Sequence, residues 1–331
     1  MAELKTKYMG LELRSPIIAA SCGLTSDVEK MVEMEEAGVG AVVLKSIFEE
    51  QINQETSGVF NAGYGMSDGY PEAEDYIKAY IRSNTIQKYV ELVRNAKSRL
   101  SIPVIASVNC FSGGEWVSFA RQLQDAGADA LELNVFILPV NEFTESAEVE
   151  NVYFEIMKSI KEQVKIPVAI KISHYFTNLS AFVDKMKAYG ANATTIFNRF
   201  YEPDININSL TMGAASVFST ATELRTTLRW TGILAGKDKN LEISASTGVH
   251  SGEAVVKLLL AGATTVQLCS VLYEKGISVI GEMNTFIKTW MESKAFESID
   301  DFRGMLSYSS IDNPDLYERA QFMKYFSNKS N

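Results

Sequence analysis

The chain has 331 residues, 46% hydrophobic and 22% charged, as is ordinary for a soluble globular protein. Its net charge of −10 argues against nucleic-acid binding, and no polybasic stretch is present for an anionic membrane. The N-terminus has no signal-peptide core, and no apolar run approaches the roughly 20 residues that span a bilayer. Three cysteines without metal-ligand spacing predict free thiols, so we expect a cytoplasmic protein that holds no metal and binds neither nucleic acid nor membrane.

Eight short apolar runs along the chain predict β-strands. They are residues 15–21, 40–46, 103–108, 130–135, 167–172, 193–198, 242–247 and 264–270. Their apolar character is nearly continuous rather than alternating, which is typical of parallel strands buried on both faces. Stretches with helical periodicity lie between them, at 28–38, 114–127, 152–164, 178–190 and 251–262.

A repeated order of helix, glycine and strand indicates how these elements connect. It recurs at Gly38, Gly127, Gly190 and Gly262, and each glycine can adopt the left-handed conformation that ends a helix. The next strand follows within a few residues, whereas the loops after strands are longer, at 47–83, 136–146 and 199–219. We therefore predict a (β/α)8 TIM barrel that forms one domain, residues 1–331, with its site at the long-loop face.

Two further segments carry structural expectations. The loop 47–83 contains four glycines and three tyrosines (Gly58, Gly63, Gly65, Gly69, Tyr64, Tyr70 and Tyr76), which suits a lid, although a plain surface excursion is the alternative. The segment 291–331 is rich in aromatic residues. We expect a helical tail that closes the flank of the barrel or forms a dimer contact.

Four polar residues end four different predicted strands: Lys45, Asn134, Lys171 and Asn198. In a closed barrel these side chains converge on one ligand. A flavin mononucleotide fits, because a lysine beside its ring stabilises the negative charge that builds on reduction. The alternative is that one or both lysines form salt bridges with barrel carboxylates such as Glu132.

The last two strands predict a phosphate site. Thr247 and Gly248 follow the seventh strand, Cys269 and Ser270 end the eighth, and barrels often bind phosphate at these loops and at a helix N-terminus. Ser251 could instead simply cap the helix that follows it.

Histidine and arginine supply candidates for the substrate side. His174, just after the fifth strand, is a candidate acid or base because its ordinary pKa suits proton transfer near neutrality. We expect His250 to lie near the phosphate. Arg199 could pair with a substrate carboxylate, or equally with Glu202 or Asp204 in its own loop. Cys22, Cys110 and Cys269 have no activating neighbour in the sequence, so we expect buried thiols there.

With these motifs in order, the chain resembles the dihydroorotate dehydrogenase family over residues 14–290. The resemblance is carried by PIIAAS, VVLKS, ELN, VAIKIS, FNR, STGVHSGEA and AGATTVQLCS. It implies an FMN-dependent barrel, an oxidoreductase acting on CH–CH donors that converts dihydroorotate to orotate in pyrimidine (UMP) biosynthesis. It also implies cofactor-binding roles for Ala20, Ser21, Lys45, Ser46, Asn134, Lys171, Asn198, Thr247, Gly248, Cys269 and Ser270, with Asn134 and Asn198 holding substrate as well.

The chain departs from the family pattern at the substrate side. Where the family has Asn-x-Ser-Cys/Ser-Pro-Asn, this chain reads Asn134-Val-Phe-Ile137-Leu-Pro139. Ile137 stands at the family's base position and cannot accept a proton, so His174, Ser112 and Cys110 become the candidate bases. PEAED at 71–75 replaces the family's substrate asparagine after strand 2, and Thr247-Gly248 replaces a Gly-Gly pair.

Two alternatives to dihydroorotate oxidation remain. One is a flavin-free, phosphate-binding lyase or isomerase that uses Lys171 as a Schiff-base amine. The other is a flavin-binding subunit without dihydroorotate activity. We expect a small-molecule substrate, a homodimer and, because three cysteines form no iron–sulfur motif, a separate electron-transfer partner if a nicotinamide is the acceptor.

Overall fold

Eight parallel strands close into a barrel in the computed structural model. The structure describes residues 2–48, 71–109, 113–200 and 202–318, without the side chains of 48, 71–83 and 113–118. The strands are β3 (Ile17–Ala19), β4 (Ala41–Val43), β6 (Val104–Asn109), β7 (Ala130–Asn134), β8 (Val168–Ile172), β9 (Ala193–Ile196), β12 (Ile243–Ser246) and β13 (Thr265–Leu268). Pairing runs around this order, and β13 returns to β3. All eight predicted strands and the (β/α)8 barrel are confirmed.

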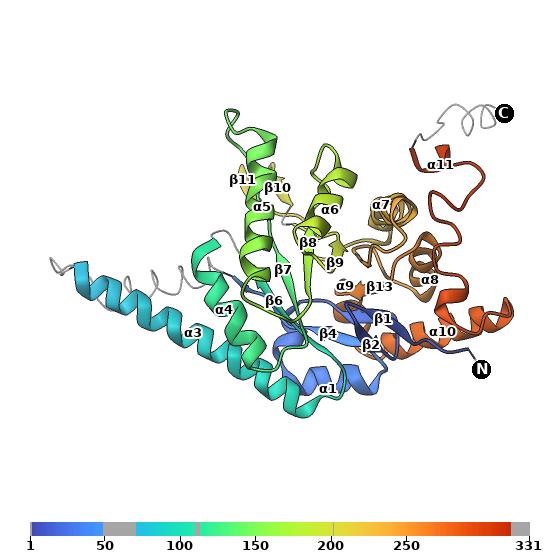
Figure 1. Cartoon of the computed structure of the whole chain (residues 1–331), viewed down its shortest axis with the longest axis horizontal. Coiled ribbons are helices and arrows are strands. Elements are labelled where there is room, and N and C mark those ends of the chain that lie inside the picture. Colours follow the sequence, from blue (N-terminus) through green and yellow to red (C-terminus); the bar gives the residue numbers. More distant parts are fainter. Residues whose placement is uncertain (1, 49–70, 110–112, 201, 319–331) are drawn as a thin grey trace.

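Helices surround the barrel on its outer side (Figure 1). They are α1 (Val28–Glu36), α3 (Pro71–Arg99), α4 (Gly113–Asp125), α5 (Ser146–Lys161), α6 (Leu179–Ala188), α7 (Leu224–Lys237), α8 (Gly252–Ala261), the short α9 (Ser270–Lys275), and α10 (Val279–Ser293). The five predicted helices are among them. The four glycines of the repeat all have φ between +95° and +115°, so each ends its helix in the left-handed conformation as expected.

An N-terminal hairpin closes the end of the barrel opposite the long loops. Its strands, β1 (Thr6–Tyr8) and β2 (Leu11–Leu13), pair antiparallel. Tyr8 and Leu13 are buried against the first inward-facing residues of the strands, such as Ile18 and Val43. Outward-facing strand residues pack instead against the helices in the larger core. The barrel is therefore filled at this end, and a ligand must enter from the other.

The predicted long loop is shorter than expected. A two-residue strand β5 (Ile47–Phe48) pairs with β6, and α3 begins at Pro71, so the expectation of loop through residue 83 is wrong for 71–83. Proline at the first helical position is favourable, because its fixed φ suits the helix and its missing N–H would be unpaired there anyway. The remainder of the proposed lid, 49–70, lies outside the described residues.

The loop 199–219 also has structure of its own. It folds into an exposed antiparallel hairpin of β10 (Pro203–Asn206) and β11 (Thr211–Ala214). The 3-10 helix η2 (Ala221–Glu223) then leads directly into α7. A second 3-10 helix, η1 (Gly23–Ser26), follows β3.

The C-terminal segment lies along the flank of the barrel. Phe302 is fully buried and contacts Trp290, and the backbone N–H of Gly304 donates to the carbonyl of Leu259 in α8 at 3.0 Å. The segment is only partly helical, with η3 (Ile299–Asp301) and α11 (Asp315–Glu318) as its short helices. The expected flank contact is confirmed as far as residue 318. Within the described part of the chain, no helix combines the length and apolar character needed to cross a membrane.

Candidate functional site

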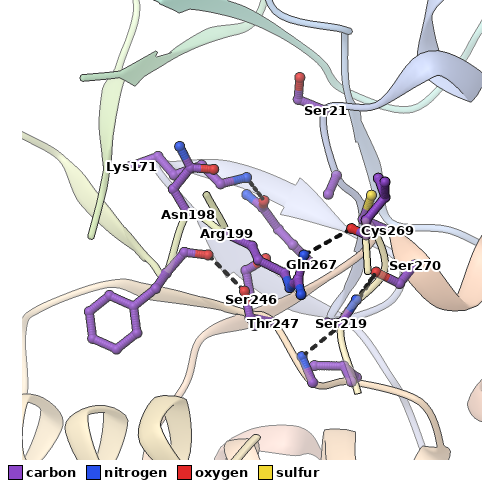
Figure 2. A pocket seen from close by; sticks show the side chains of 15 residues that line it. Ser21, Lys171, Asn198, Arg199, Ser219, Ser246, Thr247, Gln267, Cys269 and Ser270 are labelled. Carbon is purple, nitrogen blue, oxygen red and sulfur yellow. Dashed lines mark hydrogen bonds between the residues drawn. The ribbon is translucent and has the colours of Figure 1, made fainter. Parts of the chain in front are cut away.

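A pocket opens at the C-terminal ends of the strands, the face that the loop lengths predicted. Its wall comes from segments after β3, β8, β9, β12 and β13 and from the end of the 199–219 loop (Figure 2). The lining residues are Ala20, Ser21, Lys171, Phe197, Asn198, Arg199, Val217, Ser219, Ser246, Thr247, Gly248, Val249, Gln267, Cys269 and Ser270. Eight of the predicted cofactor residues are therefore brought to one pocket: Ala20, Ser21, Lys171, Asn198, Thr247, Gly248, Cys269 and Ser270.

Lys171 reaches this pocket from inside the barrel, where its ammonium is almost fully buried. Its Nζ lies 3.5 Å from Oε1 of Glu132 and donates to Oε1 of Gln267 at 3.1 Å. The other oxygen of Glu132 accepts from Gln267 Nε2 at 2.6 Å and from the Thr195 hydroxyl at 2.9 Å. Four strands, β7, β8, β9 and β13, thus each contribute one member to a buried polar network. The alternative prediction, a salt bridge between Lys171 and Glu132, is confirmed. Lys171 nevertheless lines the pocket.

Asn134 and Asn198 meet as expected, but Lys45 does not join them. Asn198 Nδ2 donates to Oδ1 of Asn134 at 2.7 Å across the ends of β9 and β7. Lys45 is exposed and lines a different hollow, between the start of α1 and α3. The expectation that all four residues converge is therefore wrong for Lys45. Alternation from the inward-facing Ala41 and Val43 would point Lys45 inward. However, β4 ends at Val43, and beyond it the alternation is lost, so that Ser46 is buried and Lys45 is exposed.

Ser46 belongs to a row of hydroxyl groups beside the pocket. It is buried, and its Oγ lies 2.9 Å from Ser21 Oγ and 2.6 Å from Ser107 Oγ. Its backbone N–H also donates to Ser21 Oγ at 2.8 Å. Only Ser21 of this row lines the pocket, so Ser46 acts there by positioning the Ser21 hydroxyl.

At the other end of the pocket, hydroxyl groups and a backbone N–H gather around Ser219. Its Oγ donates to Ser270 Oγ at 3.1 Å, accepts from the Gly248 N–H at 3.4 Å, and lies 3.2 Å from His250 Nε2. His250 also contacts the carboxylate of Glu274 through Nδ1 at 3.1 Å. Ser251 caps α8 by accepting from the Ala254 N–H, so its predicted capping role is confirmed.

The backbone at Thr247 and Gly248 has a conformation that lets it pack closely against the start of α7. Both residues have positive φ, +81° and +78°, which is uncommon for threonine and ordinary for glycine. A Cβ at Gly248 would lie 2.1 Å from the backbone nitrogen of Leu224, at the start of α7. Only glycine therefore lets this loop contact the helix N-terminus, where unpaired N–H groups favour an anion.

Arg199 lines the pocket, but its guanidinium is already engaged. Its Nε donates to Glu223 at 3.0 Å, its Nη1 to the carbonyls of Ser216 and Val217, and its Nη2 to Glu202 at 3.4 Å. The alternative prediction, that Arg199 pairs with a carboxylate of its own loop, is therefore confirmed for Glu202. Glu223 is a second partner. A substrate carboxylate would have to compete with both.

A chain of aromatic rings runs outward from Phe197 of the pocket wall. Phe136 and Phe200 stack with ring centroids 3.6 Å apart, and His174 packs edge-on to Phe197, which lines the pocket, at 5.7 Å. Burial lowers the pKa of His174 below its ordinary value, so the ring is neutral at pH 7. Ile137 packs against the hydrophobic core. Of the other candidate bases, Cys110 and Ser112 lie outside the described residues.

Gln267 and Ser219 are site residues that the sequence reasoning missed. Gln267 lies inside a predicted strand. The neighbouring sequence does not show that its side chain faces the barrel interior and hydrogen-bonds to Lys171 on another strand. Ser219 had a signal: Thr220-Ala-Thr-Glu223 reads as a capping box, and the structure forms it. A helix N-terminus directly after Ser219 marks a candidate anion site.

Comparison with known proteins gives a consistent family. The family model for dihydroorotate dehydrogenase matches residues 3–291. Among curated proteins, the chain is similar to "Dihydroorotate dehydrogenase B (NAD(+)), catalytic subunit" of Thermoplasma volcanium, 27% identical over 92% of this chain and 99% of the relative. The protein of that name from Thermoplasma acidophilum is 28% identical with the same coverage. A "Putative dihydroorotate dehydrogenase A (fumarate)" of Aeropyrum pernix is 26% identical over 91% of this chain and 97% of the relative.

The buried network makes a prediction about stability. Glu132→Ala leaves the Lys171 ammonium buried without its counter-charge, so we expect a loss of about 3–5 kcal/mol in the free energy of unfolding, measured by urea titration. The control is Glu33→Ala, which removes the exposed pair with Lys30 and should cost less than about 1 kcal/mol. Equal losses for the two variants would show that the Lys171–Glu132 pair contributes no more than a surface contact.

Proposed function

Because the chain belongs to the dihydroorotate dehydrogenase family, we propose that it is an FMN-dependent oxidoreductase that oxidises dihydroorotate to orotate in pyrimidine biosynthesis. The family implies a flavin. The observation that carries the proposal for FMN is a single pocket with two ends. One end has the buried ammonium of Lys171, and the other has a group of hydrogen-bond donors suited to an anion. A planar ring with a phosphorylated tail fits that arrangement of charges.

The residues around Ser219 suit the phosphate. Ser219 Oγ accepts from the Gly248 N–H and donates to Ser270 Oγ, so these donor groups are gathered at one end of the pocket. In this proposal they turn to the phosphate oxygens, with His250 beside them. The N-terminus of η2 and α7 adds favourable electrostatic potential, because the helix dipole has its positive end there.

Lys171 suits the ring. When bound, FMN supplies the hydride acceptor of the reaction. Lys171 supports the negative charge that reduction adds at the pyrimidine edge, and Gln267 and Glu132 hold its ammonium in place. Ala20 and Ser21 form the wall beside the ring, with Ser46 fixing the Ser21 hydroxyl. Asn134 and Asn198, linked to each other, are amide partners for ring and substrate. Lys45 is exposed, so a cofactor contact would require it to turn inward.

His174 is our proposed base for the substrate's C5 proton. Ile137 cannot accept a proton, whereas a neutral imidazole can, and the lowered pKa of His174 keeps it neutral at physiological pH. Its ring packs against Phe197 in the pocket wall. Among the described residues nearby, Lys171, Arg199 and Tyr175 are also ionisable. The two cations are already paired with carboxylates, and the Tyr175 ring packs at a tilt against the His174 ring, with centroids 4.3 Å apart.

An electron-transfer partner follows from the names of the relatives. Two of them are called NAD(+)-dependent catalytic subunits, which implies a further subunit in those enzymes. We propose that here, too, electrons pass from the flavin to a separate protein. We also propose that two copies of this chain form a homodimer. Mass measurement of the native particle tests the homodimer.

The first prediction tests the activity. Purified protein should be yellow, and dihydroorotate added without oxygen should bleach the flavin absorbance, since the substrate's hydride reduces the ring. A yellow protein that dihydroorotate does not bleach would retain the flavin and contradict the substrate. A colourless protein that gains no colour with added FMN would contradict both.

The second prediction tests the phosphate site. Ser270→Ala should weaken FMN binding about tenfold, because a hydrogen bond to a charged group contributes roughly 1.5–3 kcal/mol. Riboflavin, which lacks the phosphate, should bind both proteins alike, as measured by flavin fluorescence titration. Ser98→Ala, at an exposed serine of α3, is the control for the substitution itself. Equal weakening of FMN and riboflavin would place the phosphate elsewhere.

The third prediction tests His174. His174→Gln should keep its flavin but slow anaerobic flavin reduction by about 100-fold or more. In the unchanged protein the rate should fall as pH drops through a pKa below the ordinary 6.5, because protonation removes the base. The variant should lack this step, whereas His250→Gln, measured with saturating FMN, should retain it. If the rate of His174→Gln still falls at the same pH as that of the unchanged protein, the base is another group.

A further inference from the structure

Cys22 and Cys269 meet where the first and last strands of the barrel lie side by side. Leu268 of β13 pairs with Ala19 of β3, and the Ala20 N–H donates to the Leu268 carbonyl at 2.8 Å. Cys269 directly follows the first of these strands, and Cys22 follows the second. Their sulfurs are near enough that each shifts the pKa of the other, both side chains are half-buried, and Cys269 lines the pocket.

The two thiols have different surroundings. The pKa of Cys22 lies below its ordinary value, chiefly because the Cys269 thiol donates to its sulfur; burial opposes this, and the backbone at Thr25 and Leu24 and the Tyr273 hydroxyl assist. The pKa of Cys269 is raised, because its hydrogen is held by Cys22 and because it is buried, although Lys171 opposes the rise. One thiol is therefore prepared to attack, and the other stays protonated until it is needed.

We propose that Cys22 and Cys269 form a reversible thiol–disulfide modification site in the wall of the cofactor pocket. The oxidant is a low-molecular-weight disulfide of the glutathione class. The Cys22 thiolate attacks one sulfur of that disulfide, forms a mixed disulfide and releases a small thiolate. Cys269 then gives up its proton and attacks the Cys22 sulfur, which expels the second small thiol. Two electrons pass from the cysteine pair to the small disulfide, which is reduced to two thiols.

The geometry permits the second step. The sulfurs start as neighbours at the paired ends of β3 and β13 and must close to about 2.05 Å, the length of an S–S bond. Both cysteines lie in the segments that follow strand ends, where side-chain rotation can supply this approach. Because Cys269 lines the pocket beside Ser270, the modification changes the wall of the proposed phosphate site itself.

The experiment maps the disulfide in the flavin-loaded protein. The third thiol is first removed with Cys110→Ser. The protein is incubated with oxidised glutathione, free thiols are alkylated, and peptides are mapped by mass spectrometry without reduction. We expect a Cys22–Cys269 linkage that dithiothreitol reverses. In this background, Cys269→Ser should instead accumulate glutathione on Cys22, whereas in Cys22→Ser the Cys269 thiol should react at least about tenfold more slowly.

Three results would overturn the proposal: glutathione retained on Cys22 while Cys269 is alkylated in the protein that has both, equal reaction of the two single-cysteine variants, or no reaction at either thiol. Circular dichroism establishes that each variant is folded. If a single variant does not fold, the map of the protein with both cysteines decides alone. Flavin colour and bleaching, measured after reduction with dithiothreitol, test the proposed oxidoreductase separately from the thiol chemistry.

Discussion

The site depends on keeping one ammonium charged inside a barrel. Burying Lys171 away from water costs several kcal/mol unless a counter-charge and hydrogen bonds compensate. Glu132, Gln267 and Thr195 supply that compensation from three other strands, so the network can exist only when the sheet is closed. The Nζ of Lys171 has a direct hydrogen bond to Gln267 and a looser contact, at 3.5 Å, with the carboxylate. Its charge thus remains available to an anionic group in the pocket.

The two halves of the pocket differ in how they are made. The phosphate half is built largely from backbone and small hydroxyl side chains, and its shape depends on the tight contact between Gly248 and the start of α7. The half proposed for substrate is built from side chains: Phe197 lines the pocket and packs edge-on to His174, whereas Ile137 lies outside the pocket lining and packs against the core. His174 is therefore the base that we propose in place of the residue at position 137.

Closure of the barrel also creates the thiol pair. Cys22 and Cys269 are separated by about three quarters of the sequence, and they meet because the last strand returns to the first. The seam between β3 and β13 therefore carries both a wall of the proposed cofactor pocket and a pair of thiols whose pKa values shift in opposite directions. Any oxidation at this seam acts on the same residues that border the proposed phosphate site.

The amino-acid sequence alone determined the barrel, because eight strand runs, helical periodicity and four helix-ending glycines are local signals that reinforce one another. It also located Lys171, Asn134, Asn198 and Ser270, since a polar residue at a strand end is visible in one dimension. Only the tertiary structure decided that Lys45 faces away, that Arg199 is engaged by Glu223, and that Gln267, Ser219 and the Cys22–Cys269 pair belong to the site. Those outcomes depend on which direction a side chain takes beyond its strand and on what meets it from across the barrel. Both are set by contacts between segments far apart in the chain, which no local pattern records.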